Sequence, residues 1–242
     1  MGQDGRQDPA AAAAALSNPE APPAPSGSDV PSGSDATAEQ PGLERIKFFS
    51  DGVFAIAITL LVLSLGLPKG TTHSNLAHGL GSIWPQYGAF AFTFLLIGLR
   101  WLTHLVQFRH IRSYDYMLLG LNLGLLLVVA FLPFASKVLA HYPNSRAACI
   151  LYGASMAVAG LMSTALWWHA CRTPSIIDPG LDAYMRKNFL LRWLTLPVFF
   201  TIAIVIAAVV PNLWWARGVA FATPLVQIGF ALRSWQKGYH NF

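Results

Sequence analysis

Charged residues are scarce in this chain. Only 11% of its 242 residues are Asp, Glu, Lys or Arg, whereas soluble domains usually carry about a quarter. From residue 45 to the end, the acidic residues are limited to Asp51, Asp115, Asp178 and Asp182. A water-soluble fold of this length could not cover its surface with so few charges. The composition therefore predicts an all-α integral membrane protein.

Catalytic and metal-binding motifs are also missing. There is no HExxH, no GxSxG, no P-loop and no paired carboxylate within an apolar run, so we expect no enzyme activity and no small-molecule substrate. The two cysteines, Cys149 and Cys171, form neither a disulfide framework nor a CxxC pair, and we expect no metal or other cofactor. The basic residues are scattered between apolar runs, which argues against nucleic-acid binding despite a pI near 9.4.

Residues 1–42 differ from the rest of the chain. They contain seven prolines, an alanine run and repeated Ser-Gly pairs, with almost no large apolar residue. Such a segment buries too little surface to offset its chain entropy. The alanine run also lacks the basic flank of a secretory signal. We therefore expect a disordered cytoplasmic tail at 1–42, followed by a six-span channel domain at 43–240.

Six stretches in the second part are long and apolar enough to cross a bilayer, which needs about 20 residues per helix. Pro211-Asn212 separates the last two, because 40 residues carrying one charge, from Trp193 to Leu232, are too long for one span. The expected spans cover residues 48–67, 84–106, 115–137, 147–171, 190–211 and 213–233.

The Lys and Arg residues predict the orientation of these spans. With the N-terminus inside, the inner segments hold eleven and the outer segments four, as the positive-inside rule requires. The inner ones are Arg45, Lys47, Arg100, Arg109, Arg112, Arg172, Arg186, Lys187, Arg192, Arg233 and Lys237. The outer ones are Lys69, Lys137, Arg146 and Arg217. Both termini are thus expected in the cytoplasm, with the chain in the inner (plasma) membrane.

The segment leading into the first span holds the most informative polar residues. Asp51 is the only carboxylate beside this span, where the helix dipole favours an acidic group. Arg45 lies six residues earlier, on a different face of a helix. These residues alone leave two interpretations open: partners on other helices, or a simple cap and an anchor at the inner surface.

The same segment resembles a known family. The pattern Arg-x-x-x-Phe-Ser-Asp, filled here by Arg45, Phe49, Ser50 and Asp51, is similar to the signature of the lysosomal potassium channel family (transmembrane-protein-175-like) and its bacterial relatives. The segment Trp101-Leu-Thr-His104 in the second span also resembles the family, as do Asn122 and Leu132-Pro133-Phe134 in the third. The resemblance covers residues 43–240. Arg100 departs from it, because an aromatic residue is expected there.

This resemblance implies a bacterial potassium channel. Members have one six-span repeat per chain, assemble as homotetramers and line a central pore with their first helices. Potassium is the permeant ion and passes passively, in preference to sodium. The narrowest point would fall at Ile56, followed outward by Thr59, Leu60 and Leu63.

The resemblance also implies a polar network. Arg45 and Asp51 would tie the inner end of the first helix to the next two helices, together with His104 and Asn122. Phe49 and Ser50 complete the motif at the same place.

The residues themselves are compatible with a pore-lining helix. Ile56, Leu60, Leu63 and Leu67 recur at helical spacing, and a ring of such side chains could gate by dewetting. The alternative is that these residues face lipid or neighbouring helices and that Thr59 bonds its own backbone carbonyl.

Two other functions stay open at this stage. An ion-coupled secondary transporter would require an internal repeat, and residues 45–140 and 147–240 show no convincing duplication. A non-conducting membrane scaffold would leave the segment from Arg45 to Asp51 unexplained.

Overall fold

The computed structural model describes Met1 and residues 41–236, with side chains up to residue 229. Residues 2–40 of the predicted disordered tail therefore lie outside the described residues. Of that tail, only Met1, Pro41 and Gly42 are described. Helix α2 begins at Pro41 and runs to Leu60. Proline suits the first turn of a helix, where its missing N–H has no partner to lose.

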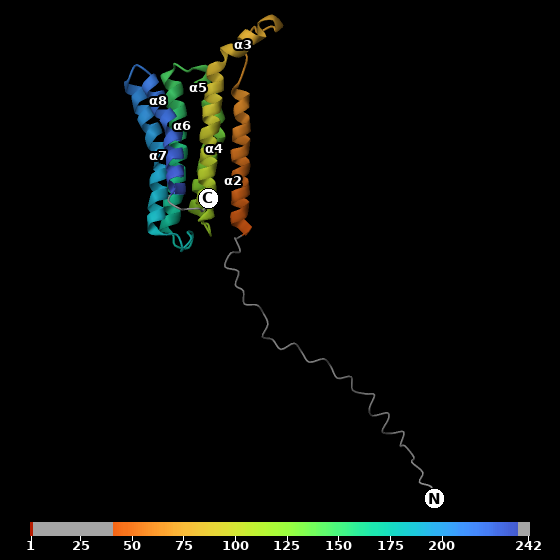
Figure 1. Ribbon diagram of the computed structural model, residues 1–242, viewed down its shortest axis with the longest axis vertical. Coiled ribbons are helices and arrows are strands. Elements are labelled where there is room, and N and C mark those ends of the chain that lie inside the picture. Colours follow the sequence, from red (N-terminus) through yellow and green to blue (C-terminus); the bar gives the residue numbers. More distant parts are fainter. Residues whose placement is uncertain (2–40, 237–242) are drawn as a thin grey trace. The chain divides into compact units, whose positions relative to one another are not determined.

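Five more long helices follow, running alternately up and down beside α2 (Figure 1). They are α4 (Trp84–Arg109), α5 (Tyr116–His141), α6 (Arg146–Arg172), α7 (Ala183–Val209) and α8 (Trp214–Gln236). In the described residues, five helical segments are long and apolar enough to cross a membrane, namely the one that starts with α2 and then α4 to α7. The chain is therefore a multi-pass, all-helical membrane protein. The sixth span stays a prediction that rests on α8.

The helix bounds differ most from expectation at the first and fifth spans. Helix α2 starts at Pro41 instead of residue 48, and a 3-10 turn, η1 (Leu61–Ser64), replaces its outer end. Helix α7 starts at Ala183 instead of residue 190, so it takes in two basic residues, Arg186 and Lys187, that hydropathy assigned to the preceding loop.

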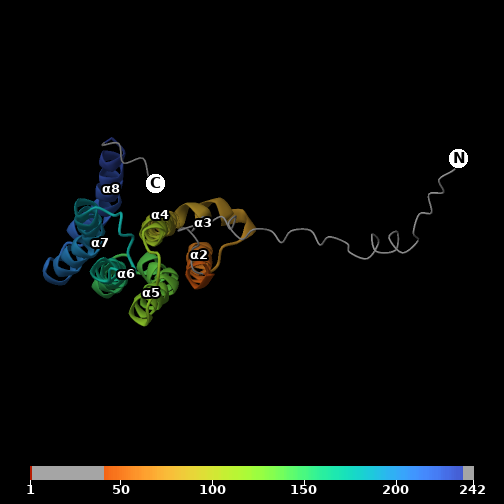
Figure 2. The same ribbon diagram turned by 90° about the horizontal axis from the view of Figure 1, so that it is seen from below.

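The helices pack in a chain of neighbours. Helix α6 packs against α5 and α7, and α8 packs mainly on α7. Helix α2 packs against α4 and α5, which cover one side of it (Figure 2). Close approach of α6 and α7 depends on small residues. A Cβ atom at Gly160 would lie only 2.6 Å from Pro197 Cδ.

Two kinds of connection join the helices. At the end where α2 finishes, the short helices η2 (His73–Asn75) and α3 (Leu76–Ser82) lead into α4. At the opposite end, the segments before α5 and before α7 pair through an isolated bridge between Ile111 and Ile177. An ion pair of 2.8 Å between Arg112 and Asp178 reinforces that pairing.

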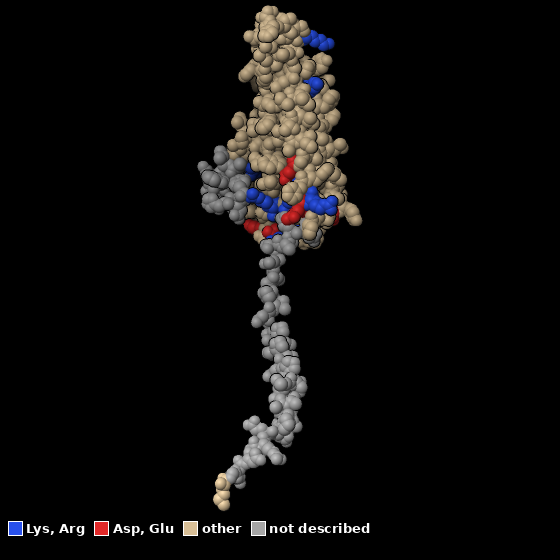
Figure 3. All heavy atoms as spheres, turned by 90° about the vertical axis from the view of Figure 1, so that its right-hand side faces the viewer, with Lys and Arg blue, Asp and Glu red and all other residues tan. Residues whose placement is uncertain are grey.

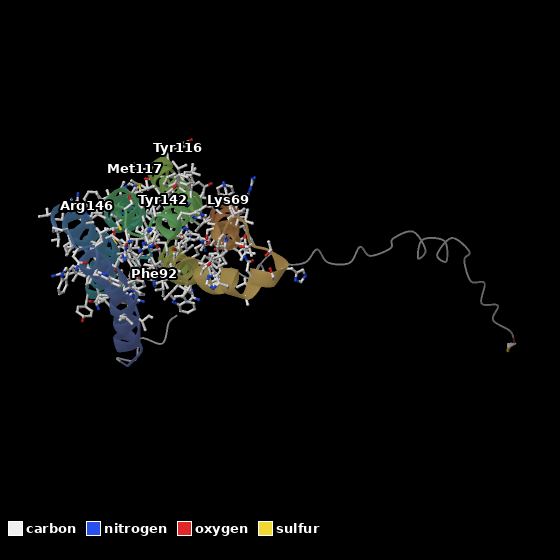
Figure 4. The ribbon with its side chains drawn as sticks, turned by 90° about the horizontal axis from the view of Figure 1, so that it is seen from above. Lys69, Phe92, Tyr116, Met117, Tyr142 and Arg146 are labelled. Carbon is white, nitrogen blue, oxygen red and sulfur yellow. The ribbon has the colours of Figure 1, made fainter. Side chains whose placement is uncertain are left out.

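Charge is distributed unevenly between the two ends. Lys, Arg, Asp and Glu gather at the end where α2 begins, and the middle of the visible face is almost free of them (Figure 3). The opposite end carries Lys69, Tyr142 and Arg146 on its connections (Figure 4). There Arg217, in the first turn of α8, donates to Pro143 O and to Asn144 Oδ1. The charge inside the expected sixth span therefore lies at the end of its helix and holds α8 to the turn between α5 and α6.

Candidate pore-lining face and the polar contacts behind it

One face of α2 is buried against α4 and α5. Its buried residues are Leu43, Ser50, Phe54 and Ala57, and Leu61 continues the stripe into η1. Intervals of three, four and seven residues put these side chains on one side of a helix. Packing of this stripe fixes which way the rest of α2 faces.

The opposite face of α2 has no neighbour within the described chain. Ile56 is 60% exposed and Leu63 is 67% exposed, with Leu60 and Thr59 exposed beside them. The predicted pore residues therefore all lie on the uncovered side. In a membrane protein such a face meets lipid or another subunit.

The hydroxyl of Thr59 already has a hydrogen-bond acceptor. It donates to Ile56 O of its own helix over 2.9 Å, which is the backbone bond that threonine often makes in helices. The hydroxyl hydrogen of Thr59 is thus used in a bond to the helix backbone. The oxygen keeps its lone pairs, so this exposed side chain presents an acceptor, which is the kind of group that a cation binds.

Behind this face, three of the predicted network residues form one hydrogen-bonded chain across α2, α5 and α4. Asn122 Nδ2 donates to Ser50 Oγ over 3.0 Å, and Ser50 in turn donates to Ile46 O. His104 Nε2 lies 3.0 Å from Asn122 Oδ1. Because that oxygen can only accept, the imidazole donates through Nε2–H. All three linked side chains are at most 2% exposed.

Asp51 has a different partner from the ones predicted. Its Oδ1 accepts a hydrogen bond of 2.8 Å from the indole Nε1 of Trp101 on α4. Trp101 was expected only as part of the family resemblance, without a role of its own. The sequence did contain a clue to this contact, namely an indole N–H donor within an apolar helix. A buried tryptophan N–H usually binds an acceptor, and Asp51 is the nearby carboxylate.

Arg45 and Phe49 do not join these contacts within the described chain. Both are exposed, and Phe49 is 58% so. They lie on the side of α2 that α4 and α5 leave uncovered. The motif is therefore divided: Ser50 and Asp51 hold α2 to its neighbours, while Arg45 and Phe49 point away from them.

Several other polar residues without a predicted role are buried by the fold. Thr93 Oγ1 lies 2.9 Å from Ser136 Oγ and 3.1 Å from Tyr152 OH, which links α4, α5 and α6. Gln107 on α4 binds the hydroxyl and carbonyl of Ser163 on α6. These bonds replace the water that membrane-buried polar groups lack.

Arg100 lies inside α4 and is 3% exposed. Its Nε and Nη1 atoms have no hydrogen-bond partner among the described residues. The guanidinium therefore belongs to the interior of the bundle, and it does not contribute to the inner charge bias as a loop residue would.

These contacts attach α2 to its neighbours on one side and leave its other side uncovered. The bonds from Ser50 and Asp51 attach its first half to α5 and α4, and Gly66 N donates to Gln86 Oε1 beyond its far end. The uncovered residues are thereby held at a defined rotation about the helix axis. Among the described residues, no group of three His, Cys, Asp or Glu could hold a metal ion. The arrangement is suited to presenting one helical face to an axis shared with other subunits.

Comparison with known proteins gives consistent matches. Residues 45–133 match the family model described as the endosomal/lysosomal potassium channel TMEM175. A potassium channel of Streptomyces collinus is 43% identical over 57% of this chain and 69% of its own length. One of Chamaesiphon minutus is 33% identical over 81% of this chain and 97% of its own.

The fold also matches a solved structure. The crystal structure of a lysosomal potassium-selective channel TMEM175 homolog from Chamaesiphon minutus superposes with a TM-score of 0.68. The sequence identity is 32%, and the match covers 81% of this chain and 99% of that one. The bundle from α2 to α8 therefore corresponds to nearly the whole of a solved channel subunit.

Proposed function

This chain belongs to the TMEM175 potassium channel family, and we propose that it forms a homotetramer in which the α2 helices surround the ion pathway. The protein is a potassium channel and not an enzyme. Conduction is passive, and its narrowest point is a ring of Ile56 side chains. A single pore helix per chain requires several copies around a closed axis.

The observation that carries this proposal is the uncovered face of α2. Ile56 and Leu60 of α2 and Leu63 of the following turn η1 are all more than 40% exposed, and α4 and α5 cover the opposite side. A helix with neighbours on one side only is suited to the centre of an assembly. Rings of branched apolar side chains then form a constriction that opens and closes by wetting.

Thr59 supports an ion pathway on the same face. Its hydroxyl hydrogen is used by the backbone, and its oxygen remains available as an acceptor. A ring of such oxygens, next to the Ile56 ring, replaces part of the hydration shell of a potassium ion. Lipid-facing positions have no need for this polarity.

The polar contacts serve to position the pore helix. Ser50, Asn122 and His104 join α2 to α5 and α4 near the charged end, and Asp51 joins it to Trp101. Arg45 and Phe49, exposed in the single chain, contact the neighbouring subunit. The network thus sets the rotation of α2 and links it to assembly.

The charged end of the bundle faces the cytoplasm. This orientation follows from the bias of Lys and Arg and from the gathering of charges where α2 begins (Figure 3). With α8 as the sixth span, both termini lie inside and the channel occupies the inner (plasma) membrane.

Ion flux into liposomes tests the pore assignment. Purified wild-type protein is compared with Ile56→Asn under potassium, caesium and sodium gradients. We expect passive flux that favours potassium, and an altered rate or ion preference in the variant, because asparagine places a polar ring at the constriction. Val205→Asn is the matched control. Val205 is 56% exposed on α7, which packs against α6 and α8.

Three results would contradict the proposal. Unchanged flux in well-assembled Ile56→Asn protein would remove Ile56 from the pathway. Equal changes in both variants would assign the effect to polarity in the bilayer and not to the pore. Flux that requires a coupled proton or sodium gradient would favour a transporter.

A further inference from the structure

A second feature of the bundle is formed by α4, α7 and α8, with no residue of α2 in its lining. Helices α4, α7 and α8 enclose a cavity of about 430 Å³, within the range of about 300–1,000 Å³ typical of ligand sites. Its apolar wall includes Leu99, Leu102, Val106 and Ile228. Helix α8 packs mainly on α7 and touches α4 at few points. The cavity is therefore open to its surroundings between α4 and α8.

Two arginines line this cavity. Arg109 ends α4, and Arg192 lies in the first half of α7. Arg109 is exposed and Arg192 is half-buried. Among the described residues, no carboxylate or other acceptor binds either guanidinium. A cation beside an apolar wall is costly without an anion, so this pair favours a negatively charged occupant.

A buried amide gives independent support. Gln227 of α8 lines the same cavity and is only 7% exposed. Its side chain makes no hydrogen bond to any described residue. The nitrogen and oxygen of this amide are not among the fully buried atoms that lack a partner, so the amide is open to the cavity. It can therefore donate to or accept from a polar group of a ligand there.

We propose that this cavity binds the headgroup of an anionic phospholipid. The phosphate is held by Arg109 and Arg192, whose planar guanidinium groups match phosphate oxygens, and Gln227 binds an ester or hydroxyl oxygen. One acyl chain lies along the apolar wall. Arg109 is the last residue of α4, which finishes at the end of the bundle where α2 begins (Figure 1). The lipid therefore comes from that leaflet, the inner one in the orientation proposed above. Basic cavities between membrane helices on this side are suited to such headgroups.

The charge balance distinguishes between lipids. The described lining contains two arginines and no acidic residue. Phosphatidylglycerol carries a net negative charge, while the choline of phosphatidylcholine brings a cation beside the arginines. We therefore expect phosphatidylglycerol to bind at least tenfold more tightly.

Native mass spectrometry of the full chain in detergent measures this preference. Each lipid is titrated onto wild type and onto Arg109→Gln/Arg192→Gln, which removes both cations. We expect one tightly bound phosphatidylglycerol per subunit in the wild type and at least a tenfold loss in the variant. Arg109→Gln alone changes an exposed side chain and gives a smaller loss in a protein that keeps its fold.

The control is Lys137→Gln/Arg146→Gln. It removes the same charge from two exposed residues of α5 and α6 whose helix ends lie away from the cavity, and it should bind phosphatidylglycerol like the wild type. Three outcomes would overturn the proposal. They are equal binding of both lipids, equal loss in the control, and displacement of the lipid by millimolar inorganic phosphate. A change in subunit number without a change in lipid binding would instead make the cavity a contact between subunits.

Discussion

Replacing Asn122 by alanine would remove the centre of the hydrogen-bonded chain behind the pore helix. Asn122 both donates to Ser50 Oγ and accepts from His104 Nε2, each over 3.0 Å. The substitution therefore removes two bonds and leaves the His104 N–H without an acceptor in a site that is 2% exposed. Ser50 keeps its bond to Ile46 O, so its hydroxyl hydrogen still has an acceptor.

The cost can be estimated from these contacts. Hydrogen bonds between membrane helices contribute about 0.6 kcal/mol each on average and at most about 1.7. An unsatisfied buried donor adds about 1–3 kcal/mol. We expect Asn122→Ala to lower the free energy of unfolding by about 2–4 kcal/mol, and to loosen α2 from α5.

A double-mutant cycle separates this bond from general packing. Unfolding free energies would be measured in mixed micelles for Asn122→Ala, His104→Ala and the double variant. We expect a coupling energy of about 1–2 kcal/mol, as for residues in direct contact. Thr93 is the matched control, because it is buried on the same helix as His104 but bonds Ser136 and Tyr152 instead. Its coupling to Asn122 should be near zero.

Additive effects of His104→Ala and Asn122→Ala would refute the reasoning. That result would mean that the two residues contribute independently and that no bond between them stabilises the fold. Coupling of the same size to Thr93 would equally refute it, because it would reflect a general loosening of α4.

Two further predictions follow from the helix contacts. Gly160→Ala should destabilise the protein by about 1–3 kcal/mol, since its Cβ would enter α7, while Gly98→Ala should be neutral because nothing lies within 4 Å; thermal unfolding of both variants checks this. Burial lowers the pKa of His110 below its ordinary 6.5, with Asp178 opposing and Arg109 adding to the shift. The folded state thus takes up this proton less readily than the unfolded one, so stability is complete above about pH 6.5 and falls as the pH drops toward the lowered pKa. Hydrogen exchange of the Asp178 amide, which donates to His110 O, should show more opening at pH 5 than at pH 7 after correction for intrinsic rates, and His110→Gln should abolish the difference.

The membrane class and the family were both accessible from the sequence. Long apolar runs with almost no acidic residue have few folded solutions outside a bilayer. The motif of Arg45, Phe49, Ser50 and Asp51 indicated the potassium channel family, and the comparisons confirm it. The helical spacing of Ile56, Thr59, Leu60 and Leu63 made a common face predictable, because the period of a helix is fixed locally.

Contacts between helices depended on the tertiary structure. Hydropathy is an average over a window of residues. It therefore could not show that α7 begins at Ala183 or that the side chain of Arg100 is buried in α4. Nothing in the spacing of Asp51 and Trp101, 50 residues apart, indicates that they meet. Partner choice across helices is set by the rotation and depth at which each helix packs. Composition and helical periodicity therefore specify the kind of protein and the faces of its helices. Packing between helices specifies which of those faces is buried and which stays uncovered on α2. It also places two arginines, which have no acceptor among the described residues, beside a cavity.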